Sequence, residues 1–332
     1  MTIIVTGGAG FIGTNFVLNR LNKFDEKVIV VDKLTYAGNE KNFINVEDNK
    51  NFHFIKCDIT NNRMIKEILN TYHPRGLINF AAETHVDNSI KSPDRFVQSN
   101  IIGTYTLLKE IKIFYETSSS TDRKNFRFLN ISTDEVFGSL NENDKNSTED
   151  SSYKPNSPYS ASKAGADHLV RAFHQTYKIP VITTNCSNNY GPFQNKEKLI
   201  PTIIKNAMNW KSLPIYGDGK NIRDWIYVLD HCSALDKILE KGEIGETYNI
   251  GGNLEMTNIE IVKIICKKLD EVLPHKNGSY SSLISFVEDR LGHDKKYALN
   301  CTKLIKKLKW SPVVLFEDGI LKTIEWYINN NK

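Results

Sequence analysis

Five polar side chains in the middle of this sequence are of types that suit proton transfer. Thr133, Asp134 and Glu135 are consecutive, and Tyr159 and Lys163 follow in the segment Tyr159-Ser-Ala-Ser-Lys163. Residues four apart on a helix share a face, so the phenol and the ammonium group can act on one bound molecule. We expect the cation to lower the pKa of the phenol, so that Tyr159 can exchange a proton with a substrate hydroxyl group.

The adjacent carboxyl groups of Asp134 and Glu135 suggest a second kind of proton transfer. Two close carboxyl groups can have their pKa values pushed apart, so that one serves as an acid and the other as a base. Acidic residues after a strand are also commonly helix caps or solvated loop residues, but Tyr159 and Lys163 in the same chain favour a chemical role. An enzyme that only oxidises an alcohol does not need the carboxyl pair, whereas one that also removes a proton and expels water does.

A glycine-rich segment near the start of the chain predicts a dinucleotide-binding turn. Gly8-Ala-Gly10-Phe-Ile-Gly13 matches the GxGxxG pattern, and it lies between a predicted strand at 2–6 and a predicted helix at 11–22. Glycines permit the tight turn, the close approach of the backbone to a pyrophosphate and the packing of helix on strand. The N-terminus of the helix then faces the phosphates. A purely structural glycine turn is the alternative interpretation.

An acidic residue at the end of the next strand indicates which dinucleotide binds. Asp32 ends a β-branched segment at 27–32, about twenty residues beyond the glycines. A carboxylate at this point accepts hydrogen bonds from the ribose hydroxyl groups and repels a 2′-phosphate. The sequence therefore favours NAD over NADP, and Lys33 beside the carboxylate weakens this preference slightly.

The order of the remaining elements predicts the fold class. Further strand-like segments alternate with helical ones, at 51–58, 76–82, 126–132 and 180–185. This alternation predicts an α/β protein with a Rossmann-type, doubly wound parallel sheet. Ser157-Pro158 marks the start of the helix that carries Tyr159, because Ser is a favoured N-cap and Pro a favoured first helical residue. We expect this helix to end near Tyr177.

The second half of the chain has a different character, which predicts a smaller C-terminal lobe for the substrate. Loops are expected at 190–198 and 214–224, helices near 200–210, 228–241, 258–273 and 316–329, and a strand at 247–251 that returns to the first sheet. We therefore expect an NAD-binding Rossmann domain over 1–187, with 229–251 returning to it, and a substrate-binding domain over 188–228 and 252–332. Polar composition predicts loops at 117–125 and 139–156. The second directly precedes the Tyr159 helix, so it either borders the active site or is a solvated surface loop.

The bulk composition excludes several functional classes. The chain has 332 residues, of which 40% are hydrophobic and 25% charged, as is ordinary for a globular protein. A net charge of +4, evenly spread, does not suggest nucleic-acid binding. No apolar segment has the length of a membrane span, and residues 1–5 form a strand and not a signal peptide. The five cysteines show no CxxC spacing, so we expect free thiols in the cytoplasm and no metal site.

Nine segments, some of them discussed above, carry a family resemblance that covers nearly the whole chain. They are TGGAGFIG (6–13), DKLTYAG (32–38), AAETHVDNSI (81–90), STDEVFG (132–138), SPYSASKAGADHLV (157–170), NCSNNYGP (185–192), EKLIP (197–201), LPIYGDGKNIRDWIYV (213–228) and DRLGHDKKYA (289–298). With these segments the chain resembles the extended short-chain dehydrogenase/reductases, and among them the dTDP-glucose 4,6-dehydratases. The Thr-Asp-Glu triplet distinguishes that family from the related epimerases and decarboxylases.

The resemblance implies a reaction and a role for each of the five polar residues. A nucleoside-diphosphate glucose would lose water to give the 4-keto-6-deoxy sugar, with tightly bound NAD. Tyr159 would take the proton of the C4 hydroxyl group as hydride leaves C4, with Lys163 and Thr133 assisting. Glu135 would remove the C5 hydrogen that the new ketone acidifies. Asp134 would protonate the departing C6 hydroxyl group, and hydride would return to C6.

The resemblance also implies binding residues, position by position. NAD contacts are expected from Gly7, Gly10, Phe11, Ile12, Gly13, Asp32, Lys33, Leu34, Thr35, Asp58, Ile59, Ala81, Ala82, Ser99, Tyr159, Lys163 and Asn189. Substrate contacts are expected from Thr84, Thr133, Asn188, Lys198, Leu199, Pro214, Tyr216, Arg223, Asn258, Arg290 and His293. The two arginines suit a diphosphate, because a guanidinium group binds its oxygens bidentately; a surface ion pair is the alternative. A homodimer is implied through helices near 93–114 and 158–177.

The sequence departs from the family pattern at four places, and the last two, near the nucleotide, leave dTDP versus UDP open. Asn88 stands where arginine is common, Phe137 where tyrosine is usual and Leu291 where proline is usual, and Gln194-Asn-Lys replaces an aromatic residue and a proline. None of these removes a catalytic group. A UDP-sugar 4,6-dehydratase, an NAD-dependent nucleotide-sugar 4-epimerase and a non-catalytic NAD-sensing protein remain as alternatives.

Overall fold

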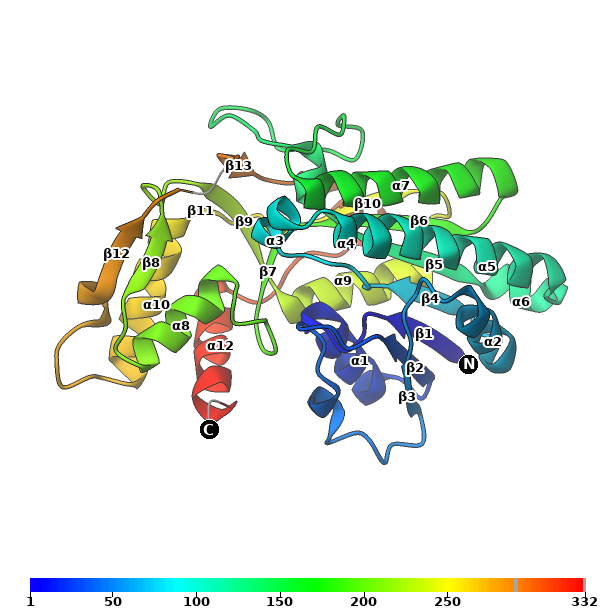
Figure 1. Cartoon of the computed structure of the whole chain (residues 1–332), viewed down its shortest axis with the longest axis horizontal. Helices are drawn as coiled ribbons and strands as arrows, with labels where there is room; N and C mark the ends of the chain where they lie inside the picture. The colour runs from blue at the N-terminus through cyan, green and yellow to red at the C-terminus, as the bar shows by residue number, and fades with distance from the viewer. Residues whose placement is uncertain (290–291, 331–332) are drawn as a thin grey trace.

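A seven-stranded parallel sheet forms the centre of the computed structural model, which describes residues 1–289 and 292–330 (Figure 1). Its strands are β1 (Thr2–Thr6), β2 (Lys27–Asp32), β3 (Phe52–Lys56), β4 (Gly76–Asn79), β5 (Arg127–Thr133), β6 (Val181–Cys186) and β10 (Thr247–Ile250). Their order is β10-β6-β5-β4-β1-β2-β3, and every neighbouring pair is parallel. The order reverses between β1 and β4, and such a switch point is where Rossmann-type sheets bind ligands.

Helices cover both faces of this sheet because its strands are apolar on both sides. The helices of this part are α1 (Phe11–Lys23), α2 (Asn62–Tyr72), α3 (Val86–Lys91), α4 (Asp94–Phe96), η2 (Val97–Ile102), α5 (Gly103–Thr117), α6 (Ser120–Asn125), α7 (Pro158–Tyr177), α9 (Val228–Lys241) and α11 (Thr302–Leu308). Ile3 and Val5 of β1 pack in one core with residues of α1 and α9, whereas Ile4 packs in a second core with residues of α2, α5 and α7. The alternation of side chains along a strand therefore produces the two-sided core.

The helix that carries Tyr159 has the start that the sequence predicts. The Ser157 hydroxyl group accepts a hydrogen bond from the backbone N–H of Ser160, and the Ser160 hydroxyl group accepts one from the backbone N–H of Ser157. This reciprocal capping box, with Pro158 at the first turn, fixes where α7 begins. The helix ends at Tyr177, followed by Lys178 in the left-handed conformation.

Smaller sheets and further helices form the C-terminal lobe. Its elements are β7 (Asn188–Tyr190), α8 (Leu199–Met208), β8 (Leu213–Tyr216), β9 (Ile222–Tyr227), β11 (Glu255–Thr257), α10 (Asn258–Val272), η4 (Tyr280–Leu283), β12 (Ile284–Val287), β13 (Lys296–Tyr297) and α12 (Phe316–Asn330). Strand β9 pairs with β7, β11 and β13, and β8 pairs with β12. The lobe has its own apolar core between α8, α10 and α12.

The structure corrects several sequence-based expectations. The segments expected as loops at 190–198 and 214–224 contain the end of β7, most of β8 and the start of β9, and the loop expected at 117–125 contains α6. The short strands have no clear local periodicity, and they form because segments far apart in the chain pair with one another. The strand expected at 247–251 is β10, and it pairs with β6 at the edge of the large sheet. None of the helices over 1–289 and 292–330 is long and apolar enough to cross a membrane.

Candidate active site

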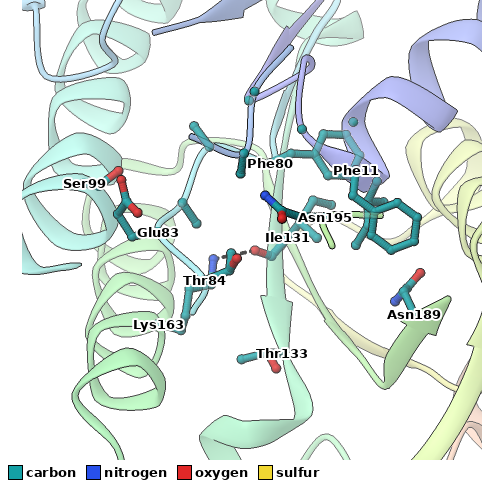
Figure 2. A pocket seen from close by; sticks show the side chains of 18 of the residues that line it. Phe11, Phe80, Glu83, Thr84, Ser99, Ile131, Thr133, Lys163, Asn189 and Asn195 are labelled. Atoms are coloured by element: carbon teal, nitrogen blue, oxygen red, sulfur yellow. Dashed lines mark hydrogen bonds between the residues drawn. The ribbon is translucent and has the colours of Figure 1, made fainter. Parts of the chain in front are cut away.

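A pocket opens at the carboxyl ends of β1, β4, β5 and β6, where the dinucleotide loop meets the end of β5. Expected NAD contacts among its lining residues are Gly7, Gly10, Phe11, Ile12, Gly13, Asp32, Lys33, Thr35, Ile59, Ala81, Ala82, Ser99, Tyr159, Lys163 and Asn189. Expected substrate contacts among them are Thr84, Thr133, Asn188 and Lys198. In Figure 2, Phe11 and Phe80 lie at one end of this pocket and Thr133 at the other. All five expected catalytic residues also line it.

Close backbone contacts require Gly7 and Gly13 of the dinucleotide loop to be glycine. Gly7 has φ +68°, and a Cβ there would lie 2.4 Å from the backbone nitrogen of Ala81. A Cβ on Gly13 would lie 2.5 Å from the Gly7 carbonyl oxygen. The nearest atom to a Cβ on Gly10 would be 3.4 Å away, and Gly10 lines the pocket. The backbone at Gly10 is therefore open to a close-lying phosphate, and the loop fits a dinucleotide.

The Asp32 carboxylate is held rigidly at the end of β2. Asp32 Oδ2 accepts a hydrogen bond from the backbone N–H of Ala9 at 3.0 Å, and Oδ1 accepts one from Leu34 at 2.8 Å. Burial raises the pKa of Asp32, and these hydrogen bonds with the charge of Lys33 oppose that rise. The Lys33 ammonium group also lies 3.4 Å from the Asp58 carboxylate, so its positive charge acts on both Asp32 and Asp58. The residues present thus fit recognition of the adenosine ribose of NAD.

Asp134 and Glu135 follow the end of β5 in a short helical turn, η3 (Asp134–Phe137). Thr133 Oγ1 donates a hydrogen bond to Asp134 Oδ1, and accepts one from the backbone N–H of Glu135, both at 3.3 Å. Asp134 is 4% exposed, whereas Glu135 is partly exposed. Burial raises the pKa of Asp134 well above its usual value, and the negative charges of Glu135 and Asp224 raise it further, against the opposing charge of Arg223. The Asp134 carboxyl group is therefore suited to donate a proton.

Tyr159 and Lys163 share one face of α7, but their electrostatics differ from the sequence-based expectation. Burial raises the pKa of Tyr159 well above its ordinary value, and the charge of Glu135 adds to this rise. The Lys163 ammonium group donates a hydrogen bond to the Ile131 carbonyl oxygen at 2.7 Å (Figure 2). The expected lowering of the phenol pKa by the cation is thus wrong for this structure, because burial and a nearby carboxylate raise this pKa and the Lys163 ammonium group is bonded to a backbone oxygen.

Several expected substrate residues lie outside the pocket lining. Leu199 begins α8, Pro214 and Tyr216 belong to β8, Arg223 to β9 and Asn258 to the start of α10, while His293 lies in the segment before β13. These positions belong to the C-terminal lobe. Arg290 and Leu291 fall outside the described residues.

The guanidinium group of Arg223 is not in a surface ion pair. Arg223 is 7% exposed and donates hydrogen bonds to the backbone oxygens of Ile222, Asp294 and Lys295. It also lies 4.5 Å from the ring centre of Tyr297. These contacts fasten β9 to the segment before β13, so Arg223 has a packing role that the sequence did not reveal.

Sequence reasoning missed several residues of the pocket lining. Glu83, Gln194, Asn195 and Glu197 all line the pocket. Gln194 donates a hydrogen bond to the backbone oxygen of Asn189 at 2.9 Å. Glu83 and Glu197 lie inside segments that carried the family resemblance, and Gln194 and Asn195 belong to a departure from the family pattern, so these were the available signals. No group of three or more His, Cys, Asp or Glu side chains that could hold a metal ion occurs among the residues described.

Comparison with known proteins identifies the class of enzyme. The family model described as GDP-mannose 4,6 dehydratase matches residues 4–323, and the chain belongs to this family. Its fold and site accord with an extended short-chain dehydrogenase/reductase.

The individual relatives narrow this class to one activity. The dTDP-glucose 4,6-dehydratase of Xanthomonas campestris pv. campestris (strain B100) is 50% identical over 330 residues, which are 99% of this chain and 93% of that protein. The crystal structure of the dTDP-glucose 4,6-dehydratase DesIV from Streptomyces venezuelae, with NAD and TYD bound, is 40% identical, with a TM-score of 0.90, and the match covers 100% of this chain and 98% of that one.

The fold alone does not separate dehydratase from epimerase. The UDP-glucose 4-epimerase of Thermotoga maritima, crystallised with UDP-glucose, has a TM-score of 0.87 to this chain at 28% identity, over the full length of both chains. The distinction therefore depends on the site residues and on the higher identity to the dehydratases.

Proposed function

We propose that this protein dehydrates dTDP-glucose to the 4-keto-6-deoxy sugar with bound NAD. The observation that carries this proposal is the buried Asp134 beside the partly exposed Glu135, in the same pocket as Tyr159 and the dinucleotide loop. A 4-epimerase needs no such carboxyl pair, whereas the elimination of water needs one group that removes a proton and one that delivers it. The chemistry that NAD supplies when bound is acceptance of hydride from sugar C4 and its return to C6.

The surroundings of each catalytic side chain support a separate role. Tyr159 exchanges a proton with the C4 hydroxyl group, assisted by Thr133, which lies at the end of β5 in the same pocket. Glu135 removes the C5 proton. Asp134 delivers a proton to the C6 oxygen, in keeping with its raised pKa. Lys163 contributes a cation at the base of the pocket, where the nicotinamide ribose would lie.

The domain boundaries are also part of the proposal. We infer that residues 1–187 with 229–251 bind NAD, and that 188–228 with 252–332 bind the nucleotide sugar. The large sheet supports the first assignment, since it includes β10 from the returning segment. The second draws support from Asn188 and Lys198, which project from the C-terminal lobe segments into the pocket.

A helical surface supports a homodimer. Large apolar side chains are exposed on η2, α5 and the end of α7, namely Val97, Ile102, Tyr105, Ile113 and Tyr177, at 39–47% exposure. Helices α5 and α7 pack against each other, so these side chains lie on neighbouring elements. Exposed apolar patches of this kind mark protein interfaces. The buried free thiols accord with a cytoplasmic location.

A product assay tests the proposed function. The protein is incubated with dTDP-glucose, and separately with UDP-glucose, and the products are identified by NMR. We expect the 4-keto-6-deoxy sugar from dTDP-glucose, with incorporation of solvent deuterium at C5. A product inverted at C4 with its C6 hydroxyl group retained would establish the epimerase instead. Faster turnover of UDP-glucose would show that the enzyme prefers the uridine nucleotide.

A further inference from the structure

A buried carboxylate lies one helical turn beyond Lys163 on α7. Asp167 is 5% exposed, and three donors converge on it. Asn130 Nδ2 donates to Asp167 Oδ1 at 2.8 Å, while Ser132 Oγ at 2.5 Å and the Tyr153 hydroxyl group at 3.2 Å donate to Oδ2. These donors come from β5 and from the segment that precedes α7, so the carboxylate joins three parts of the chain.

Three consecutive residues of β5 hold the two buried charged groups of α7, Lys163 and Asp167. The side chains of Asn130 and Ser132 point to one face of the strand and bind Asp167. The carbonyl oxygen of Ile131, between them, accepts the hydrogen bond from the Lys163 ammonium group. Any shift of α7 along β5 would break both sets of hydrogen bonds together, so Asp167 fixes the register of the helix that carries Lys163.

Hydrogen bonds extend this network to the dinucleotide loop. Asn79 Nδ2 donates to Asn130 Oδ1 at 3.4 Å, and Thr6 Oγ1 donates to Asn79 Oδ1 at 2.7 Å. Thr6, Asn79 and Asn130 are all fully buried, at 0–1% exposure. Thr6 directly precedes Gly7, so a continuous polar network joins Asp167 to the start of the glycine loop, from the middle of β5 across the ends of β4 and β1.

The carboxylate also provides the countercharge for a buried ammonium group. Burial lowers the pKa of Lys163, and Asp167 is the first of the groups that oppose this change, before Cys186. Burial raises the pKa of Asp167 to about 6, against the opposing effects of Lys163 and the three donors. A buried ammonium group without a countercharge would lose its proton readily or destabilise the fold.

We propose that Asp167 is a positioning residue that keeps Lys163 charged and holds it at a fixed place beneath the nicotinamide ribose. The role given to Lys163 rests on the proposed function, whereas the coupling between the two side chains does not. Among the described residues, the other titratable groups that shift the pKa values of the pair are Tyr153 and Cys186. Burial raises the pKa of Tyr153, and raises that of Cys186 to about 12, so both stay neutral between pH 6 and 10.

The test compares NAD binding by Asp167→Asn with binding by Tyr153→Phe, across this pH range, by calorimetry. Asp167→Asn removes the countercharge, so the loss of NAD affinity at alkaline pH should begin at a pH lower by about one unit or more. Tyr153→Phe removes a hydrogen bond from the same carboxylate without changing the charge of that carboxylate. The pH above which NAD affinity falls, the alkaline limit, should therefore be the same in this variant as in the wild type. Asp167→Glu, which keeps the charge, should return the limit toward the wild-type value.

The outcomes separate this inference from the proposed function. An alkaline limit that is the same in Asp167→Asn and in the wild type overturns the inference, whatever the product assay gives, because the titration contains no sugar. If Asp167→Asn does not fold, the double variant Lys163→Met/Asp167→Asn removes the uncompensated ammonium group and should fold. A double variant that stays unfolded assigns Asp167 a purely structural role and also overturns the inference.

Discussion

At the scale of single residues, the two adjacent carboxyl groups after β5 have different surroundings. Asp134 is buried, and the charges of Glu135 and Asp224 lie near it, so its proton is retained to higher pH. Glu135 is partly exposed at the same pocket. A difference in burial and charge between neighbouring carboxyl groups is what assigns one as acid and the other as base.

Tyr159→Phe tests the proton transfer at C4. The variant removes a hydroxyl group and should leave α7 intact, because the phenol is not part of its cap. We expect the oxidation of C4 to slow by roughly 10²–10⁴-fold, as is typical when one positioned acid or base is lost. Stopped-flow measurement of NADH formation checks this, and a trace equal to that of the wild type would show that Tyr159 is not the acid/base.

Glu135→Gln separates the two halves of the reaction. The amide keeps the shape of the side chain but cannot remove the C5 proton. Oxidation at C4 should therefore persist, while exchange of deuterium into C5 and formation of the 6-deoxy product should fall by roughly 10²–10⁴-fold. NMR of the products, with Asp134→Asn as the matched variant, checks the assignment. Asp134→Asn should retain C5 exchange and slow the loss of water. Formation of the 6-deoxy product by Glu135→Gln at a rate near that of the wild type would contradict the role of Glu135 as the base.

The pH dependence of water loss follows from the raised pKa of Asp134. A group that must donate a proton is active below its pKa in the folded protein, so the elimination step should slow as pH rises through that raised value. Rapid-quench analysis of the 6-deoxy product over a range of pH measures this limb. The fall in the elimination rate with rising pH should disappear in Asp134→Asn. A fall that persists unchanged in this variant would show that another group donates the proton.

At the scale of elements, the site depends on how α7 begins and on what holds it against β5. The capping box at Ser157 sets the first turn, and Tyr159 and Lys163 follow on the buried face. The end of β5 provides Thr133 and the η3 turn. Two elements joined through buried side chains therefore place every expected catalytic group. A local change at the cap should lower the stability of the protein before it lowers the catalytic rate.

Ser157→Ala should destabilise the protein by about 0.5–2 kcal/mol, the usual cost of losing an N-cap hydroxyl group. Ser157→Asp is the matched control, because aspartate also accepts the hydrogen bond from the N–H of Ser160. Urea unfolding monitored by circular dichroism measures both variants. Equal stability of Ser157→Ala and the wild type would mean that the cap does not limit the stability of α7.

At the scale of the whole molecule, the exposed apolar side chains of η2, α5 and α7 lie on three helical elements that pack against one another. None of these side chains lines the pocket, so the proposed dimer need not contribute them to the site. It can still stabilise the helices that carry Tyr159 and Lys163, because burial of this surface adds apolar contacts to α7.

Tyr105→Glu should convert the proposed dimer into a monomer, because it places a charge within the apolar surface of α5. The control is Val313→Glu, at a site that is 80% exposed and lies outside that surface. Analytical ultracentrifugation of both variants and the wild type measures the mass. A wild-type monomer, or a Tyr105→Glu dimer, would contradict the proposed interface.

The sequence by itself determined the large sheet, the dinucleotide loop and the catalytic helix. The β-branched segment at 27–32, the glycines of 8–13 and Ser157-Pro158 each act through local chemistry that is readable without contacts to other parts of the chain. Strand β2 and the start of α7 lie where the sequence predicts them, whereas the strand expected at 76–82 ends at Asn79.

Only the tertiary structure decided the electrostatics of the site and the contacts of the C-terminal lobe. The pKa of Tyr159 is raised and not lowered, because burial and the charge of Glu135 act on it through space. Arg223 is enclosed by the backbone of residues 294–295, some seventy residues further along the chain. Asp167 gains its three donors from β5 and from Tyr153. Desolvation and Coulomb interactions depend on which distant segments pack together, and no local pattern in the sequence specifies that packing.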